Sequence, residues 1–90
     1  MVKEQIKPKE YNKQSTSDEN TLLLFNDDVN SFDYAIESLV EVCGHDTFQA
    51  EQCAMIAHYN GKCPIYTSSM DEIVPLSNVL SDRGLSVQIN

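Results

Sequence analysis

The sequence predicts an α+β fold: an open sandwich in which a three-stranded antiparallel sheet packs against three helices, in the order β-α-α-β-α-β. Three observations predict it. Short runs of strand type alternate with longer segments whose apolar residues recur every three or four positions. All three glycines fall where one of those longer segments ends. The length of 90 residues is sufficient for one small domain and little more.

The first 20 residues differ in composition from the rest of the chain. They contain four lysines and four acidic residues among Gln, Asn and Ser, with only scattered apolar side chains. Such a segment buries too little apolar surface to fold alone, so we expect residues 1–20 to form a flexible N-terminal tail. The tail is either a leader without a role or an extended segment that engages a partner. The core domain is then expected to span residues 21–90.

The first strand and the first helix are separated by a polar turn. Residues 21–25 form a short apolar run and predict a buried strand. The strand ends at residues 26–28, Asn-Asp-Asp, which favour turns. A helix is predicted from Phe32, with Asn30 or Ser31 as its N-cap. The apolar stripe of this helix, expected to face the core, consists of Phe32, Ile36, Leu39, Val40 and Cys43.

The second helix carries capping residues at both ends. Gly44 ends the first helix, and Asp46 then begins the next one, with Gln49 three residues on as a capping box. The helix is expected to end at Gly61. Residues 63–68, with Ile-Tyr-Thr at their centre, predict the second strand.

The third helix contains a proline. Ser69 and Glu72 form a second capping box at its start. Pro75 lies too deep for a first-turn proline, so a kink or a delayed helix start is expected there. Gly84 ends the helix, and residues 85–89 alternate apolar and polar side chains, which predicts a half-buried strand.

The net charge excludes two classes of partner. Fourteen acidic and six basic side chains give a formal charge of −8, and the whole excess falls on residues 21–90, where Lys62 and Arg83 are the only cations. Such a surface repels phosphate backbones and anionic lipid, so neither nucleic acid nor a membrane is expected as a partner. No apolar run approaches the ~20 residues that span a bilayer.

Two metal-site patterns fail on their spacing. Residues 26–37 resemble a calcium loop in their Asx positions, but Ser31 stands where the loop needs glycine, and a strand precedes it. Five side chains offer zinc ligands without a tight pair: Cys43, His45, Cys53, His58 and Cys63. The odd cysteine number and the lack of a C-x-x-C pair favour reduced thiols and a cytoplasmic location.

No motif in the sequence identifies an enzyme. There is no G-x-S-x-G, no Gly-rich phosphate loop and no paired acid and base. Neither catalysis nor a cofactor is expected.

Two motifs together resemble a known family. Residues 25–28, Phe-Asn-Asp-Asp, and residues 58–62, His-Tyr-Asn-Gly-Lys, lie thirty residues apart, as in the ClpS family of bacterial Clp protease adaptors. The resemblance covers residues 21–90 in one register. It implies an adaptor that binds the free N-terminus of a substrate beginning with Leu, Phe, Tyr or Trp (an N-degron). The adaptor would deliver that substrate to an AAA+ unfoldase of the ClpA or ClpC type.

The resemblance also implies which residues bind the substrate. An ammonium group carries three donors and needs acceptors, which Asn26, Asp27 or Asp28, and neutral His58 provide. Each such bond contributes roughly 1.5–3 kcal/mol. The first side chain would enter an apolar pocket between the first two helices. Further binding and pocket positions carried over from the family are Asn30, Phe32, Ala54, Ala57 and Val87.

Several of these positions depart from the family pattern. Asn30 replaces the usual Thr, while Phe32 and Ala54 each replace a usual Met, so the preferred first residue stays open. The family's acidic unfoldase contact corresponds to Ser69, with Asp71 and Glu72 close by. By resemblance, residues 1–20 would be offered to the unfoldase pore, and the adaptor would be a monomer.

Two other functions remain as alternatives. The C-terminal domain of the ribosomal stalk protein has a similar βααβαβ order, and such a module would bind partners through helix surfaces without amine recognition. A small thiol- or metal-dependent enzyme is the third possibility.

Overall fold

The structure is a computed structural model that describes residues 19–90, so nearly all of the tail predicted over residues 1–20 lies outside the described residues. Six elements follow one another in the predicted β-α-α-β-α-β order, which confirms the α+β fold class. They are β2 (Asn20–Phe25), α3 (Phe32–Cys43), α4 (Thr47–Asn60), β3 (Lys62–Ser68), α5 (Met70–Asp82) and β4 (Val87–Ile89).

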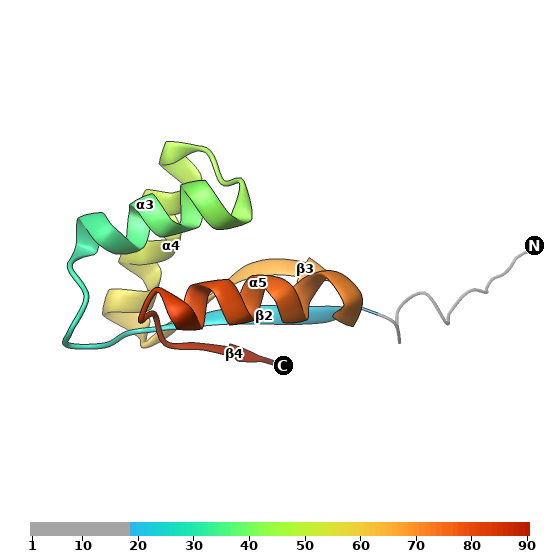
Figure 1. Ribbon diagram of the computed structural model, residues 1–90. Coiled ribbons are helices and arrows are strands. Elements are labelled where there is room, and N and C mark those ends of the chain that lie inside the picture. The colour runs from blue at the N-terminus through green and yellow to red at the C-terminus, as the bar shows by residue number, and fades with distance from the viewer. Residues whose placement is uncertain (1–18) are drawn as a thin grey trace, which may run out of the picture.

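The three strands form one antiparallel sheet with β2 in the centre, in the order β3-β2-β4. Leu22 and Leu24 of β2 are buried, and Leu23 between them is only half-buried, because successive side chains of a strand point to opposite faces. The helices pack on the face that carries the buried leucines (Figure 1). The β2–β3 register shifts between Leu22 and Leu23, which leaves Ile65 of β3 as an extra residue.

The ends of α3 and α4 follow the predicted caps. The Ser31 hydroxyl accepts from the Tyr34 amide at 3.0 Å, and the Asp46 carboxylate accepts from the Gln49 amide at 2.7 Å. Gly61 ends α4 with φ of 96°, a left-handed conformation that glycine adopts without steric cost. Ser31, rather than Asn30, is therefore the N-cap of α3.

The start of α5 differs from the prediction. Ser69 is the N-cap residue but makes no side-chain cap bond, and the hydroxyl of Ser68 binds Glu72 instead. The helix begins at Met70 and continues through Pro75, so the expectation of a delayed start is wrong. Pro75 is exposed, and the carbonyl it leaves without an amide donor is that of Asp71, an exposed residue of the first turn, so the lost bond does not bury an unpaired carbonyl.

The last strand is shorter than predicted. It begins at Val87 rather than at Leu85, because the Leu85 amide still donates to the Leu80 carbonyl at the end of α5. The predicted alternation nevertheless holds, with Leu85 buried and Gln88 exposed.

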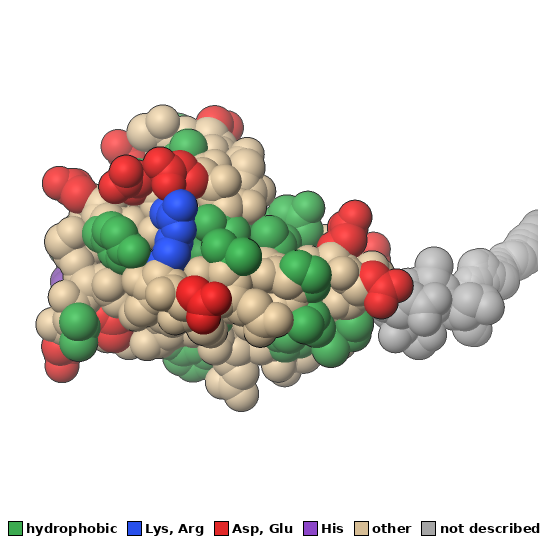
Figure 2. Space-filling view, in the orientation of Figure 1, with side chains coloured by type: hydrophobic (Ala, Val, Ile, Leu, Met, Phe, Trp, Pro, Cys, Tyr) green, Lys and Arg blue, Asp and Glu red, His purple; other side chains and the backbone are tan. Residues whose placement is uncertain are grey.

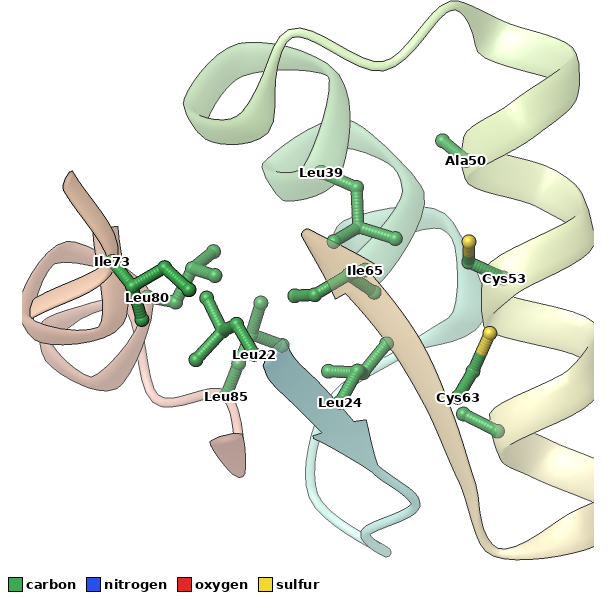
Figure 3. Close-up of a cluster of buried hydrophobic side chains, with 11 residues drawn as sticks. Leu22, Leu24, Leu39, Ala50, Cys53, Cys63, Ile65, Ile73, Leu80 and Leu85 are labelled. Carbon is green, nitrogen blue, oxygen red and sulfur yellow. The ribbon is translucent and has the colours of Figure 1, made fainter. Parts of the chain in front are cut away.

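The core lies between the sheet and the helices (Figure 3). It includes Leu22 of β2, Leu39 of α3, and Ile73 and Leu80 of α5, all four of which are fully buried. Phe32 was predicted to belong to this core, but its side chain is 42% exposed. It occupies the first position of α3, beyond the part of the helix that the sheet covers.

Within residues 19–90, none of the helices has the length and apolar character that crossing a membrane requires.

Candidate functional site

The two motifs that were thirty residues apart in the sequence meet at one end of the sheet. The Asn26 amide, just after β2, donates to the Gly61 carbonyl between α4 and β3 at 2.9 Å. The Phe25 amide donates to the Ser86 carbonyl, just before β4, at 2.8 Å. These two backbone bonds fix the Asn-Asp-Asp turn beside the C-terminal end of α4.

A cleft of about 640 Å³ opens at this place, within the range usual for small-ligand sites. Its polar lining comes from the turn, the start of α3 and the end of α4, and its apolar lining comes from β2, α3, α4 and Leu85. The residues that line it are Leu24, Phe25, Asn26, Asp27, Asp28, Asn30, Ser31, Phe32, Ala35, Ala54, Met55, Ala57, His58, Tyr59 and Leu85. Two carboxylates and no lysine or arginine are among them, so the cleft favours a cation.

The Asp27 carboxylate is largely occupied within its own turn. Its Oδ1 accepts from the amides of Val29 (2.9 Å) and Asn30 (2.8 Å), and its Oδ2 accepts from the Asn30 side-chain amide (3.0 Å). Partial burial raises the pKa of Asp27, but these hydrogen bonds and the Ser86 hydroxyl outweigh it and hold the pKa below its ordinary value of 3.8. A carboxylate has about four acceptor positions, so these three bonds and the one from the Ser86 hydroxyl leave Asp27 without a free position.

The side chain of Asn30 faces inward. Its Nδ2 donates to Asp27 Oδ2 and also to the Gly84 carbonyl at 2.7 Å. Both partners are acceptors, so the atom between them must be the amide nitrogen, and both of its hydrogens are used. The role expected for Asn30 by resemblance, a hydrogen bond to the peptide, is therefore left to its Oδ1 alone.

Three other polar side chains of the cleft have unused acceptors. Within residues 19–90, no hydrogen bond engages the side chains of Asn26, Asp28 or His58, and all three residues are exposed. The His58 ring packs edge-on against Tyr59, with ring centroids 4.9 Å apart. The C-terminal carbonyls of α4 add a partial negative charge of about half an electron at the same end.

The apolar wall combines small buried side chains with larger ones at the rim. Ala54 and Ala57 are buried on α4, whereas Phe32 and Met55 are each about two-fifths exposed (42% and 43%). The two alanines leave space between α3 and α4, and the larger side chains border its opening. The bottom of the cleft, formed by these two alanines, is therefore wide. By the resemblance described above, the position of Ala54 usually carries the larger Met.

Sequence reasoning missed several cleft residues. Ala35 lies three residues after Phe32 and Met55 lies four before Tyr59, so helical spacing from the motif residues would have found them. No local pattern indicates Leu85, which reaches the cleft only because β4 pairs with β2.

Four of the expected residues do not line this cleft. Val87 is half-buried on β4 and packs against the core. The expected unfoldase contacts Ser69, Asp71 and Glu72 lie together at the start of α5, where Asp71 and Glu72 are exposed and form the acidic first turn.

The side chains considered for zinc lie apart, and no group of three potential metal ligands is brought together within residues 19–90. His45 belongs to the core: its Nε2 lies 2.7 Å from the Ile65 carbonyl, which the bulge of β3 leaves available, and this ring nitrogen therefore carries the proton. Its Nδ1 is buried without a partner in the described part of the chain.

The cysteines are free thiols inside the fold. Burial, together with neighbouring Cys53, raises the pKa of Cys43 to about 11. The same causes, with a hydrogen bond to Cys53, raise the pKa of Cys63 to about 12. Both groups are therefore neutral thiols at physiological pH, which is unsuited to nucleophilic catalysis.

Comparison with known proteins identifies the family. No curated protein matches this chain. Its fold is similar to that of Agrobacterium tumefaciens ClpS2, solved with L-phenylalaninamide bound, with a TM-score of 0.65 and 15% sequence identity; the match covers 81% of this chain and 98% of that one. The family model described as "ATP-dependent Clp protease adaptor protein ClpS" matches residues 15–88. Since this match covers most of the sequence, the chain belongs to the ClpS family of Clp protease adaptors.

Proposed function

We propose that this adaptor binds the free N-terminal amine of a substrate protein in the cleft beside the Asn-Asp-Asp turn. One observation carries the proposal. The cleft joins unused acceptors at one end, those of Asn26, Asp28 and His58, to an apolar space at the other. An N-terminal residue has the same two parts: an ammonium with three donors, and next to it a side chain.

The electrostatics of the cleft favour an ammonium. Asp28 supplies an exposed carboxylate, the neighbouring Asp27 adds a second negative charge, and the C-terminal end of α4 adds a partial negative charge. A neutral amide at the same place would lose the charge-assisted part of each bond, roughly half its strength.

The apolar space favours a large first side chain. The alanines of α4 leave a floor that a Leu, Phe, Tyr or Trp side chain would fill, and burial of such a side chain contributes roughly 1.5–3 kcal/mol. The ligand of the similar Agrobacterium protein, L-phenylalaninamide, has a free amine and an aromatic side chain, which supports this class of substrate.

We further propose that the adaptor, as a monomer in the bacterial cytoplasm, delivers its substrates to a Clp unfoldase of the ClpA or ClpC type. The exposed acidic turn at the start of α5, with Ser69, Asp71 and Glu72, is the proposed contact. Residues 1–20, which lie almost entirely outside the described residues, are proposed as the segment offered to the unfoldase pore.

The amine-binding proposal predicts a strict requirement for a free N-terminus. Fluorescent peptides that begin with Phe or Leu should bind, and the same peptides with an acetylated N-terminus should bind at least about tenfold more weakly, because acetylation removes the charge and two donors. Fluorescence anisotropy measures both affinities.

A pair of charge-matched variants serves as the control. Asp28→Asn should weaken binding of the free-amine peptide, whereas Asp82→Asn, an exposed acid at the end of α5, should leave it unchanged. Equal affinity for the free and acetylated peptides would contradict amine recognition. An equal loss of peptide affinity in the two variants would show that Asp28 acts only through the net charge of the protein.

A further inference from the structure

The turn that carries the candidate amine site is tied to a distant part of the chain. Asn30 donates to the Gly84 carbonyl, 54 residues later, between α5 and β4. The same side-chain nitrogen donates to Asp27, so one amide group joins the Asn-Asp-Asp turn to the α5–β4 connection. Together with the Ser86 hydroxyl, which hydrogen-bonds Asp27, this side-chain contact attaches the turn to the α5–β4 connection within the described residues.

The α5–β4 connection is itself firmly held. The Tyr34 hydroxyl of α3 donates to the Arg83 carbonyl at 2.9 Å. The Arg83 guanidinium donates to the Ser38 hydroxyl at 3.2 Å and to the Glu41 carboxylate at 2.7 Å, both on α3. The Gly84 carbonyl is therefore a fixed acceptor, anchored on α3 on one side of the cleft.

We propose that Asn30 is a positioning residue, which fixes the Asp27 carboxylate and the Asn-Asp-Asp turn against the α5–β4 connection instead of binding the substrate through its amide nitrogen. This inference rests on the proposed amine binding. Its basis is the use of both Nδ2 hydrogens: one binds Asp27 Oδ2 and the other binds the Gly84 carbonyl, so no donor is left for a peptide.

The position requires an amide rather than a hydroxyl or a carboxylate. A hydroxyl has one hydrogen and serves one of the two acceptors, and a carboxylate has none. An aspartate at position 30 would face the Asp27 carboxylate and the Gly84 carbonyl, both of which repel it. A direct acceptor role for Asn30 predicts the opposite, because an added carboxylate near the ammonium would strengthen binding.

The variants separate the two roles. In the full chain, Asn30→Ala should weaken binding of a Phe-initiated peptide by about tenfold, and Asn30→Asp should weaken it at least as much. Asn78→Asp, which adds the same charge at an exposed position of α5, should bind like the wild type. Wild-type affinity in Asn30→Ala, or tighter binding by Asn30→Asp, would overturn the positioning role.

Nuclear magnetic resonance of the ¹⁵N-labelled wild-type chain tests the same point without a variant that must fold. The two side-chain amide protons of Asn30 should exchange slowly with water in the free protein and shift little when the peptide is added. The Asn26 side-chain amide should shift strongly. An unprotected Asn30 amide, or one that shifts as much as that of Asn26, would overturn the proposal.

The same measurements distinguish this inference from the function on which it rests. Absence of peptide binding by the wild type would contradict amine recognition. The exchange protection of the Asn30 amide in the free protein would still decide whether the amide holds the turn.

Discussion

At the scale of single residues, two adjacent aspartates have different surroundings. Asp27 accepts three hydrogen bonds within its own turn, whereas no hydrogen bond within residues 19–90 engages the Asp28 side chain. The sequence could not separate them, because both carboxylates follow Asn26 in the same motif. Two of the bonds to Asp27 come from the backbone amides of Val29 and Asn30, and the third comes from the Asn30 side chain, which Gly84, 54 residues away, also binds.

The thiols provide a prediction at the same scale. Cys43 and Cys63 have pKa values raised to about 11 and about 12, so their reactive thiolate forms are scarce near neutral pH. A thiol-specific reagent should therefore modify these two cysteines slowly in the folded protein at about pH 8, and all three cysteines rapidly in denaturant. Absorbance of the released chromophore follows the reaction.

The sign of the pH effect follows from the same shifts. A raised thiol pKa means that the fold favours the protonated form, so this contribution to stability is complete below the ordinary value of 9.0. It decreases as the pH rises from there toward about 11 and about 12. Fast modification of Cys43 or Cys63 by the thiol reagent in the native protein at neutral pH would contradict the burial of these two thiols.

At the scale of elements, the glycine that ends α4 also supports the site. Gly61 has a left-handed backbone, and its carbonyl accepts from the Asn26 amide. Gly44 ends α3 in a similar conformation, and its amide donates to the Leu39 carbonyl, which is not part of the cleft lining. Neither glycine has an atom within 4 Å of the place where a Cβ would stand, so substitution strains only the backbone.

These two glycines form a matched pair of variants. Gly61→Ala and Gly44→Ala should each lower the free energy of unfolding by about 1–2 kcal/mol, the cost of a left-handed non-glycine residue. Only Gly61→Ala should also weaken the proposed peptide binding, because it displaces the carbonyl that holds the Asn-Asp-Asp turn. Urea unfolding and anisotropy measure the two effects, and equal affinity in both variants would contradict the link between α4 and the turn.

Local signals predicted most of the fold, and long-range contacts account for what they missed. The caps Ser31 and Asp46 act within three residues of their partners, so the starts of α3 and α4 were predictable. Pro75 was expected to disturb α5, but its exposed place in the early turns makes the lost bond inexpensive. Phe32 fits the apolar spacing of a core residue, yet only the packed structure places it at a cleft rim.

The same distinction applies to the candidate site. Every residue of the Asn-Asp-Asp turn lines the cleft, together with His58, Ala54 and Ala57, while their roles in binding stay a prediction. Val87 does not, because β4 turns it toward the core. Leu85 does, although its sequence neighbours carry no indication of it.

At the scale of the whole molecule, the acidic surface acts on any cationic ligand. Figure 2 shows a face on which acidic side chains outnumber basic ones, in line with the formal charge of −8. The exposed Asp28 carboxylate lies within this field, at the cleft. A substrate N-terminus that approaches the cleft is therefore attracted before it makes contact.

This attraction predicts a salt-dependent association rate. Raising the ionic strength from about 50 mM to about 500 mM shortens the screening length from about 14 Å to about 4 Å. The association rate of a free-amine peptide should then fall several-fold, while its dissociation rate changes little. Stopped-flow fluorescence measures both rates. An acetylated peptide of otherwise neutral sequence is the control, and a rate for the free-amine peptide that is independent of salt would contradict the prediction.

The central position of β2 has a mechanical consequence. The strand enters the sheet at Asn20, at one end, and leaves it at Phe25, beside the Asn-Asp-Asp turn at the other (Figure 1). A pull applied at Asn20 along the strand must shear two hydrogen-bonded ladders at once. A pull at the chain's other end loads only β4, an edge strand of three residues. The fold therefore resists force better at Asn20 than at the β4 end of the sheet.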